Sequence, residues 1–220
     1  MRPIGHFLYN RDMFLGLSGA DLLIVFVSLL ISMTIHEAMH GFVAHWLGDK
    51  TAQEAGRLTL NPLRHIDTFT TILLPLVLIV SGQPPFFIAK PVPFNPYRVR
   101  YGAYGVALVG LAGPFTNLAL AVLASIPAHF MDSGSGIFTM LALFMQVNIA
   151  FFVFNMIPFP PLDGSRLLYA FAPDTVREVM ERIEAIGFMA IIVFMLVVFQ
   201  FIGPFISRID SGIFTFLLLH

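Results

Sequence analysis

The chain has 220 residues, of which 57% are hydrophobic and only 11% are charged, and its mean hydropathy is +0.84. Soluble domains carry roughly a quarter of charged residues, so this composition indicates an all-α integral membrane protein. The net charge of −1 offers no basic surface for a nucleic acid. Because the chain has no cysteine, disulfides, thiolate metal ligands and a cysteine nucleophile are excluded.

The first long apolar run, residues 18–46, predicts a membrane-spanning helix that contains the sequence HEAMH in its second half. His36 and His40 are one helical turn apart, so both imidazoles lie on the same face and can share one metal ion. Glu37 lies beside them, where a carboxylate can take a proton from metal-bound water. The pattern H-E-x-x-H is the signature of zinc metalloproteases, and ionisable groups in hydrocarbon indicate function by default. The motif predicts hydrolysis of a peptide bond within the membrane, with one zinc ion per chain.

Residues 51–66 are too polar to span a membrane. Gly56 to Leu60 alternates in the manner of a β-strand, and Asn61-Pro62 favours a turn. An edge strand here would hold an unwound substrate segment by strand addition. We therefore expect the substrate to bind along this stretch, at Arg57, Leu58, Thr59 and Leu60.

Thr68 to Val80 is apolar, but it is short and interrupted by Pro75. A run of this length favours a re-entrant or tilted segment over a full span. The proline-rich stretch that follows, residues 83–100, cannot form a regular helix because its prolines lack backbone donors.

The remaining chain contains three further spans, at residues 102–130, 137–157 and 186–205. A tight polar turn is expected at 132–136 and an amphipathic interfacial helix within 165–184. The tail, Ile213 to Leu219, is too short to cross unaided. The expected fold has about four to six transmembrane helices in a single domain over 1–220, with a catalytic core at about 20–170 and C-terminal helices at about 171–220.

Two histidines leave a zinc ion short of the three protein ligands that a catalytic site uses. Asp163 is the best candidate for the third ligand, because three prolines stop the helix just before it and Gly164 permits a tight turn. His45 is about half a turn out of phase with His36, His65 lies in the polar loop and His129 at the opposite membrane face. The loop carboxylates Glu54 and Asp67 remain alternatives.

The predicted reaction uses Glu37 as the base that activates water and then protonates the leaving amine. A nearby amide can help to stabilise the oxyanion. Asn155, at the end of the third span, is the first choice for that role. Asn117 is the second choice, and we expect it instead to position the substrate or to hold helices together.

A transporter or channel for divalent metal is the main alternative function, because His and Asp within a membrane also suit an ion path. The positive-inside rule does not decide the topology. We prefer the arrangement that places the metal-binding end of the first span on the cytoplasmic side of a bacterial or archaeal cytoplasmic membrane. The expected partners are the lipid bilayer and a transmembrane protein substrate, and the oligomeric state is left open.

The chain resembles the site-2 proteases, zinc metalloproteases that cleave transmembrane segments. HEAMH matches the HExxH of that family, residues 155–164 match its Asn/Pro-rich LDG motif, and GPFTN matches the motif of its intervening helix. GRLTLNPLRHID and AKPVPFNP resemble loops of the small subgroup that lacks PDZ and CBS domains. The resemblance covers roughly residues 20–170. It implies zinc bound by His36, His40 and Asp163, Glu37 as the base, and a re-entrant β-hairpin after the first helix.

Overall fold

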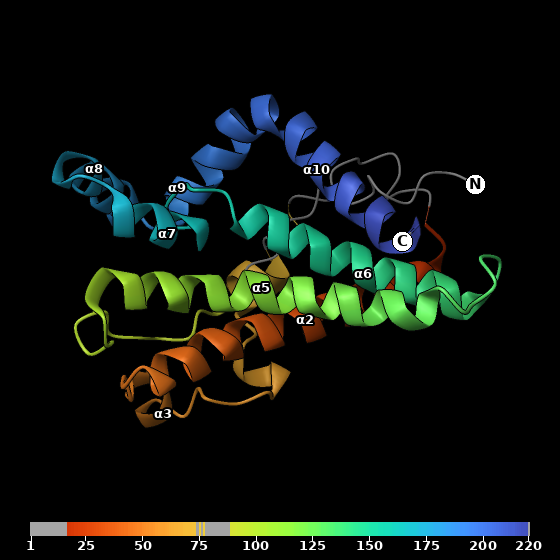
Figure 1. Cartoon of the computed structure of the whole chain (residues 1–220), viewed down its shortest axis with the longest axis horizontal. Coiled ribbons are helices and arrows are strands. Elements are labelled where there is room, and N and C mark those ends of the chain that lie inside the picture. The colour runs from red at the N-terminus through yellow and green to blue at the C-terminus, as the bar shows by residue number, and fades with distance from the viewer. Residues whose placement is uncertain (1–16, 74, 76, 78–88, 220) are drawn as a thin grey trace.

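The computed structural model describes residues 17–73, 75, 77 and 89–219, and in these residues all regular secondary structure is helical. Three long helices lie side by side and carry most of the core, and the C-terminal helix runs over one of them (Figure 1). The elements are, in order, α2 (Gly19–Trp46), α3 (Thr51–Glu54), η2 (Pro62–Arg64), η3 (Thr68–Leu73), α5 (Gly102–Ala128), α6 (Gly136–Asn155), α7 (Gly164–Phe171), α8 (Asp174–Ala185), α9 (Phe188–Val193), η4 (Phe194–Val198) and α10 (Phe199–Leu219).

Four helices in the described part of the chain are long and apolar enough to span a membrane: Gly19–Trp46, Gly102–Ala128, Gly136–Asn155 and Met189–Leu218. This confirms the all-α integral membrane fold. Helix α2 begins as its sequence predicts, because the Ser18 and Asp21 side chains each bond the other residue's main-chain N–H in a capping box. One side of α2 remains apolar and exposed, as a lipid-facing surface requires.

The core lies where α5, α6 and the C-terminal helix meet. Small residues on α5, including Ala121 and Ala124, allow α6 to approach closely, and Met145 and Ile149 of α6 fill the interface. Phe194 is almost completely buried against the same cluster. This packing fixes α5 relative to α6, and α5 in turn packs against α2.

The C-terminal helix differs from the prediction. The sequence indicates a span that ends near Phe205 and a separate short tail, whereas helix continues without interruption from Phe188 to Leu219, with Pro204 inside α10. Proline removes one backbone donor, but in hydrocarbon the other helical bonds have no water to compete with them, so the helix persists. The helix is bent within its length (Figure 1), as is typical of a helix that contains proline.

A buried polar pair joins α10 to α6. The Gln146 side-chain amide donates to the Asp210 carboxyl, and both side chains are completely buried. The Gln146 side-chain oxygen and the second carboxyl oxygen of Asp210, Oδ1, have no hydrogen-bond partner among the described residues. The pair therefore links the two spanning helices through a buried hydrogen bond.

The amphipathic region after Asp163 forms two helices rather than one, α7 and α8, which are separated at Ala172 and Pro173. Proline disfavours helical geometry in the residue before it, which explains the break. Arg166 and Glu184 link the two helices through a half-buried ion pair, with Nη2 2.5 Å from Oε1. The expected Glu178–Arg182 pair is present on the exposed face of α8, at 3.8 Å.

The β-strand expected over Gly56 to Leu60 is not formed. These residues are irregular, and Thr59 N–H bonds back to the Arg57 carbonyl in a tight turn instead of pairing with another strand. The turn at Asn61 is present, because its side chain caps η2 by accepting from the Leu63 N–H. Of the expected re-entrant segment, 68–73 forms η3, while most of 74–88, including the remainder of any hairpin, lies outside the described residues.

Asp49 connects the end of α2 to the segment that leads into α5. Its Oδ1 accepts from Thr51 N–H and Oγ1, and its Oδ2 accepts from Asn95 N–H at 2.6 Å. Burial opposes ionisation of this fully buried side chain, but these hydrogen bonds and the Arg98 charge outweigh it and lower the pKa of the Asp49 carboxyl. The carboxylate therefore stabilises the fold only while it is ionised.

We expect Asp49→Asn to lower the free energy of unfolding by about 1–3 kcal/mol at neutral pH, because the new NH₂ must face a backbone donor. Since the pKa of Asp49 is depressed in the fold, its contribution is present above the unfolded pKa of about 4 and is lost as the pH falls through the folded pKa. The difference between the two proteins should shrink in acid. Thermal unfolding in detergent as a function of pH measures it, with Asp132→Asn in an exposed turn as the control. Equal loss in both variants would contradict the assignment.

Candidate metal centre

Three side chains from distant parts of the chain meet between α2, α5 and the loop before α7. His36 Nε2 lies 3.0 Å and His40 Nε2 3.3 Å from Asp163 Oδ2, and the two Nε2 atoms are 3.1 Å apart. In a tetrahedral zinc site with bonds of about 2.0–2.1 Å, ligand atoms lie about 3.3 Å apart. The three atoms are therefore close to the spacing of ligands that share a single zinc ion.

The hydrogen bond behind His36 determines which of its nitrogens faces the centre. Asn117 Nδ2 donates to Asn148 Oδ1 at 2.9 Å and to the Ser32 carbonyl at 3.3 Å, which leaves Asn117 Oδ1 as an acceptor. His36 Nδ1 lies 2.5 Å from that oxygen and must carry the proton. The Nε2 of neutral His36 then presents a lone pair to Asp163.

His40 has the same arrangement with a different partner. Its Nδ1 lies 2.7 Å from the Val109 carbonyl, which can only accept, so Nε2 again presents a lone pair. Two neutral imidazole lone pairs and a carboxylate oxygen repel one another unless a cation lies between them. The donor set therefore fits zinc, a d¹⁰ ion that takes His nitrogen and Asp oxygen.

Asp163 reaches the histidines because its loop is folded closely against the end of α6. Pro158 has no backbone N–H, and helix α6 ends before it, at Asn155. Gly164 lies so close to the Met156 main chain that a Cβ there would collide with it. The tight fold directs the carboxylate back toward α2, as the sequence predicts. The Asp163 side chain is only 22% exposed.

Gly113 of α5 forms the opposite wall of the centre. A Cβ built on it would lie 2.5 Å from His40 Nε2 and 2.6 Å from His36 Nε2. One turn earlier, a Cβ on Gly110 would lie 3.0 Å from the Asp163 main-chain oxygen. The two glycines therefore let α5 approach both the histidines and the Asp163 loop.

Glu37 lies beside the centre with one oxygen already engaged. Its Oε2 accepts from the Val92 main-chain N–H at 2.9 Å, and Oε1 accepts no hydrogen bond from the described residues. A carboxylate held in this way keeps one oxygen available for proton transfer.

The two predicted asparagines lie in different surroundings. Asn117 is completely buried behind His36, and its side chain bonds His36 and the Ser32 carbonyl of α2 and Asn148 of α6, as in the expected alternative that it holds helices together. Asn155 is half-buried at the end of α6 and donates one amide hydrogen to the Phe151 carbonyl at 3.0 Å. Among the expected substrate residues, Arg57 donates to the Lys90 and Pro91 carbonyls, and Leu58 packs toward Gly41.

The other candidate ligands lie elsewhere. Glu54 is exposed and pairs with Arg98 at 3.4 Å, and Asp67 caps η3 by accepting from Phe69 and Thr70. His65 Nε2 bonds the Thr59 carbonyl. Among the described residues, His36, His40 and Asp163 make the one cluster whose donor atoms can share a metal ion.

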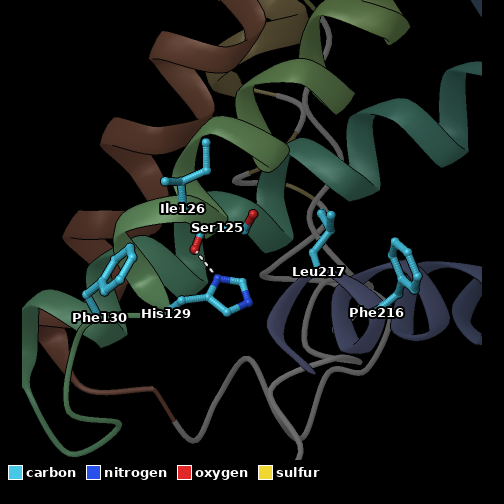
Figure 2. A pocket seen from close by; sticks show the side chains of 6 residues that line it. All are labelled: Ser125, Ile126, His129, Phe130, Phe216 and Leu217. Atoms are coloured by element: carbon cyan, nitrogen blue, oxygen red, sulfur yellow. Dashed lines mark hydrogen bonds between the residues drawn. The ribbon is translucent and has the colours of Figure 1, made fainter. Parts of the chain in front are cut away.

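A separate cavity of about 470 Å³ opens between the far end of α5 and the end of α10 (Figure 2). Ser125 is twelve residues beyond Gly113, which places this cavity about 18 Å along the helix from the metal centre. His129 uses Nδ1 to bond the Ser125 carbonyl at 2.6 Å. The lining is otherwise mostly apolar, and it is made by Ser125, Ile126, His129, Phe130, Phe216 and Leu217. The cavity is thus not part of the metal centre.

Sequence reasoning missed four contributors: Asn148, Gly113, and the main-chain groups of Val109 and Val92. Asn148 carried a usable signal, since a side-chain amide in the middle of the apolar span 137–157 needs a polar partner. Gly113 lay within the GPFTN motif, but its role depends on helix packing. A main-chain carbonyl or amide carries no signal in residue type.

Comparison with known proteins agrees with this geometry. Residues 130–198 match the model of peptidase family M50. The protein named "Putative zinc metalloprotease YwhC" from Bacillus subtilis is 37% identical over 176 residues, which cover 76% of this chain and 77% of that protein. The chain belongs to peptidase family M50. The expected membership of the site-2 proteases is thereby confirmed.

Other similar proteins include two that are named "Putative zinc metalloprotease Rip2". The one from Mycolicibacterium smegmatis is 28% identical over 79% of this chain and 67% of its own length. The one from Mycobacterium tuberculosis H37Rv is 31% identical over 80% of this chain and 66% of its own length. No solved structure matches the chain. This M50 protein is therefore a membrane metalloprotease with zinc as its cofactor.

Proposed function

We propose that this M50 protein hydrolyses a peptide bond in or near a transmembrane segment of another membrane protein, as in regulated intramembrane proteolysis. The observation that carries the proposal is the depth of the His-His-Asp cluster within a spanning helix. His36 is ten residues before the end of α2 at Trp46, or about 15 Å along the axis. A peptide bond brought to this centre would lie within the thickness of the bilayer.

In the proposed site, His36, His40 and Asp163 hold zinc, and Asn117 and the Val109 carbonyl orient the two rings. When bound, zinc lowers the pKa of a coordinated water and polarises the scissile carbonyl. Glu37 accepts a proton at Oε1 and returns it to the leaving amine.

Asn155 is our proposed donor to the developing oxyanion. Its Nδ2 has two hydrogens, and the Phe151 carbonyl uses one of them. Phe151 also lies against His36, with ring centroids 6.1 Å apart, so the end of α6 borders the metal centre. The second hydrogen can therefore serve a reacting group.

We propose one membrane-embedded domain with the metal-binding end of α2 toward the cytoplasm, in the cytoplasmic membrane of a bacterium or archaeon. The shared core of α5, α6 and α10 supports a single domain. Transport of a divalent metal through the same cluster is the alternative. It is less favoured because the three donor atoms converge on one point rather than following a path.

The test compares purified wild type with Glu37→Gln on a panel of single-span membrane proteins. We expect about one zinc per chain in both proteins and loss of cleavage by at least about 100-fold in the variant, because the base is removed while the metal ligands remain. Elemental analysis and gel assays measure the two quantities. Retained cleavage in Glu37→Gln would contradict the proposed role of Glu37 in proteolysis. Zinc flux into liposomes that survives the substitution would favour transport over proteolysis.

A further inference from the structure

Residues 89–94, here called the strap, form an extended segment that crosses α2 beside the metal centre. The strap has neither helix nor strand, yet Ala89 and Val92 are buried. Its beginning is fixed by the Lys90 N–H, which donates to the His65 carbonyl at 2.8 Å, and by Arg57, which donates to the Lys90 carbonyl at 2.8 Å. Just beyond its end, Asn95 N–H bonds Asp49. The strap is therefore anchored on both sides of its middle residue.

That middle residue, Val92, contacts α2 in two ways. Its main-chain N–H donates to Glu37 Oε2, and its side chain lies so close to Gly41 that a Cβ on the glycine would come within 3.0 Å of Val92 Cγ1. Glu37 and Gly41 are one turn apart on the same face of α2. The strap thus fits this face through a hydrogen bond and a matching close contact.

The flanking residues allow only one register. Pro91 and Pro93 have no N–H, so a shift of the strap by one residue in either direction would present a proline nitrogen to the Glu37 carboxylate. Only Val92 can donate at this place. A loop that only covered α2 would not need a single N–H donor placed between two prolines.

Hydrogen bonding of one carboxylate oxygen limits rotation of the group. With Oε2 held by Val92, Oε1 keeps a constant orientation, and proton transfer depends strongly on the orientation of the base. We propose that the Val92 main-chain amide is the positioning group for Glu37, and that the strap acts through this bond in catalysis. The proposal rests on the proposed proteolytic function.

The experiment compares Val92→Pro with Val92→Ala in the full-length enzyme in detergent. Both variants lose the valine side chain, but only proline removes the N–H. We expect kcat to be about 10- to 100-fold lower in Val92→Pro than in Val92→Ala, as for a misplaced catalytic group. KM and bound zinc should be similar in the two variants.

The outcomes separate this inference from the proposed function. If wild type cleaves and the two variants have the same kcat, the positioning role of the Val92 amide is wrong and the proposed proteolytic function is unaffected. A change confined to KM also overturns it, because the strap would then bind substrate. If wild type itself cleaves no substrate, the proposed function fails first. Should Val92→Pro not fold, an ester in place of the Pro91–Val92 amide removes the same hydrogen with little change in shape, and the same loss of kcat is expected.

Discussion

Gly113→Ala is expected to abolish zinc binding and, with it, all cleavage. The added methyl would lie 2.5 Å from His40 Nε2 and 2.6 Å from His36 Nε2, inside the space that the metal and its ligands require. Helix α5 cannot move away easily, because its small residues Ala121 and Ala124 already pack closely against α6. We expect zinc in the purified protein to fall from about one ion per chain to near zero by elemental analysis.

The matched control is Gly136→Ala. A Cβ on Gly136, at the start of α6, meets nothing within 4 Å, so the variant should keep its zinc, and alanine favours the helix by up to about 1 kcal/mol. Full zinc in Gly113→Ala would show that the three ligands do not converge at this wall of α5.

Asp163→Ala is expected to weaken zinc binding by more than about 100-fold, which exceeds the usual effect of losing a residue that only hydrogen-bonds a metal ligand. It removes one of three converging donors and the only negative charge among them. Two neutral imidazoles remain, with their rings still held by Asn117 and the Val109 carbonyl. Competition with a fluorescent zinc chelator measures the affinity, and cleavage of a single-span substrate should be lost in parallel.

Asp174→Ala serves as the control. The Asp174 carboxylate is 94% exposed at the start of α8, and the substitution removes the same charge from the protein. Its zinc affinity should equal that of wild type. If Asp163→Ala kept wild-type affinity, a different third ligand would be required. No other His, Asp or Glu among the described residues lies within reach of both histidines.

The spanning helices were predictable because their signal is local. Each is a long apolar run that must satisfy its own backbone in hydrocarbon, and only a helix does so within one segment. The last span was predicted to end near Phe205, because that prediction also rested on local sequence alone. Gly203-Pro204 normally interrupts a helix, but α10 continues through it because the membrane leaves the chain no better alternative.

The predicted strand over Gly56 to Leu60 was wrong, because a strand depends on contacts that are not local. A strand exists only with a partner, and alternation of residue types cannot show whether one is present. In the fold, Arg57 instead donates through its side chain to carbonyls of the strap. Long-range contacts therefore decided the conformation of this loop.

The membrane-spanning fold and the placement of His36, Glu37 and His40 could be predicted from residue order alone, because they follow from long apolar runs and from the period of a helix. The sequence also indicated Asp163, through the prolines that end α6. Three features depend on how the helices and loops pack together: Asn117 bonds His36, Gly113 leaves no side chain against the two histidines, and the Val92 amide bonds Glu37. These features depend on main-chain atoms and on distances between separate helices, which residue types do not encode.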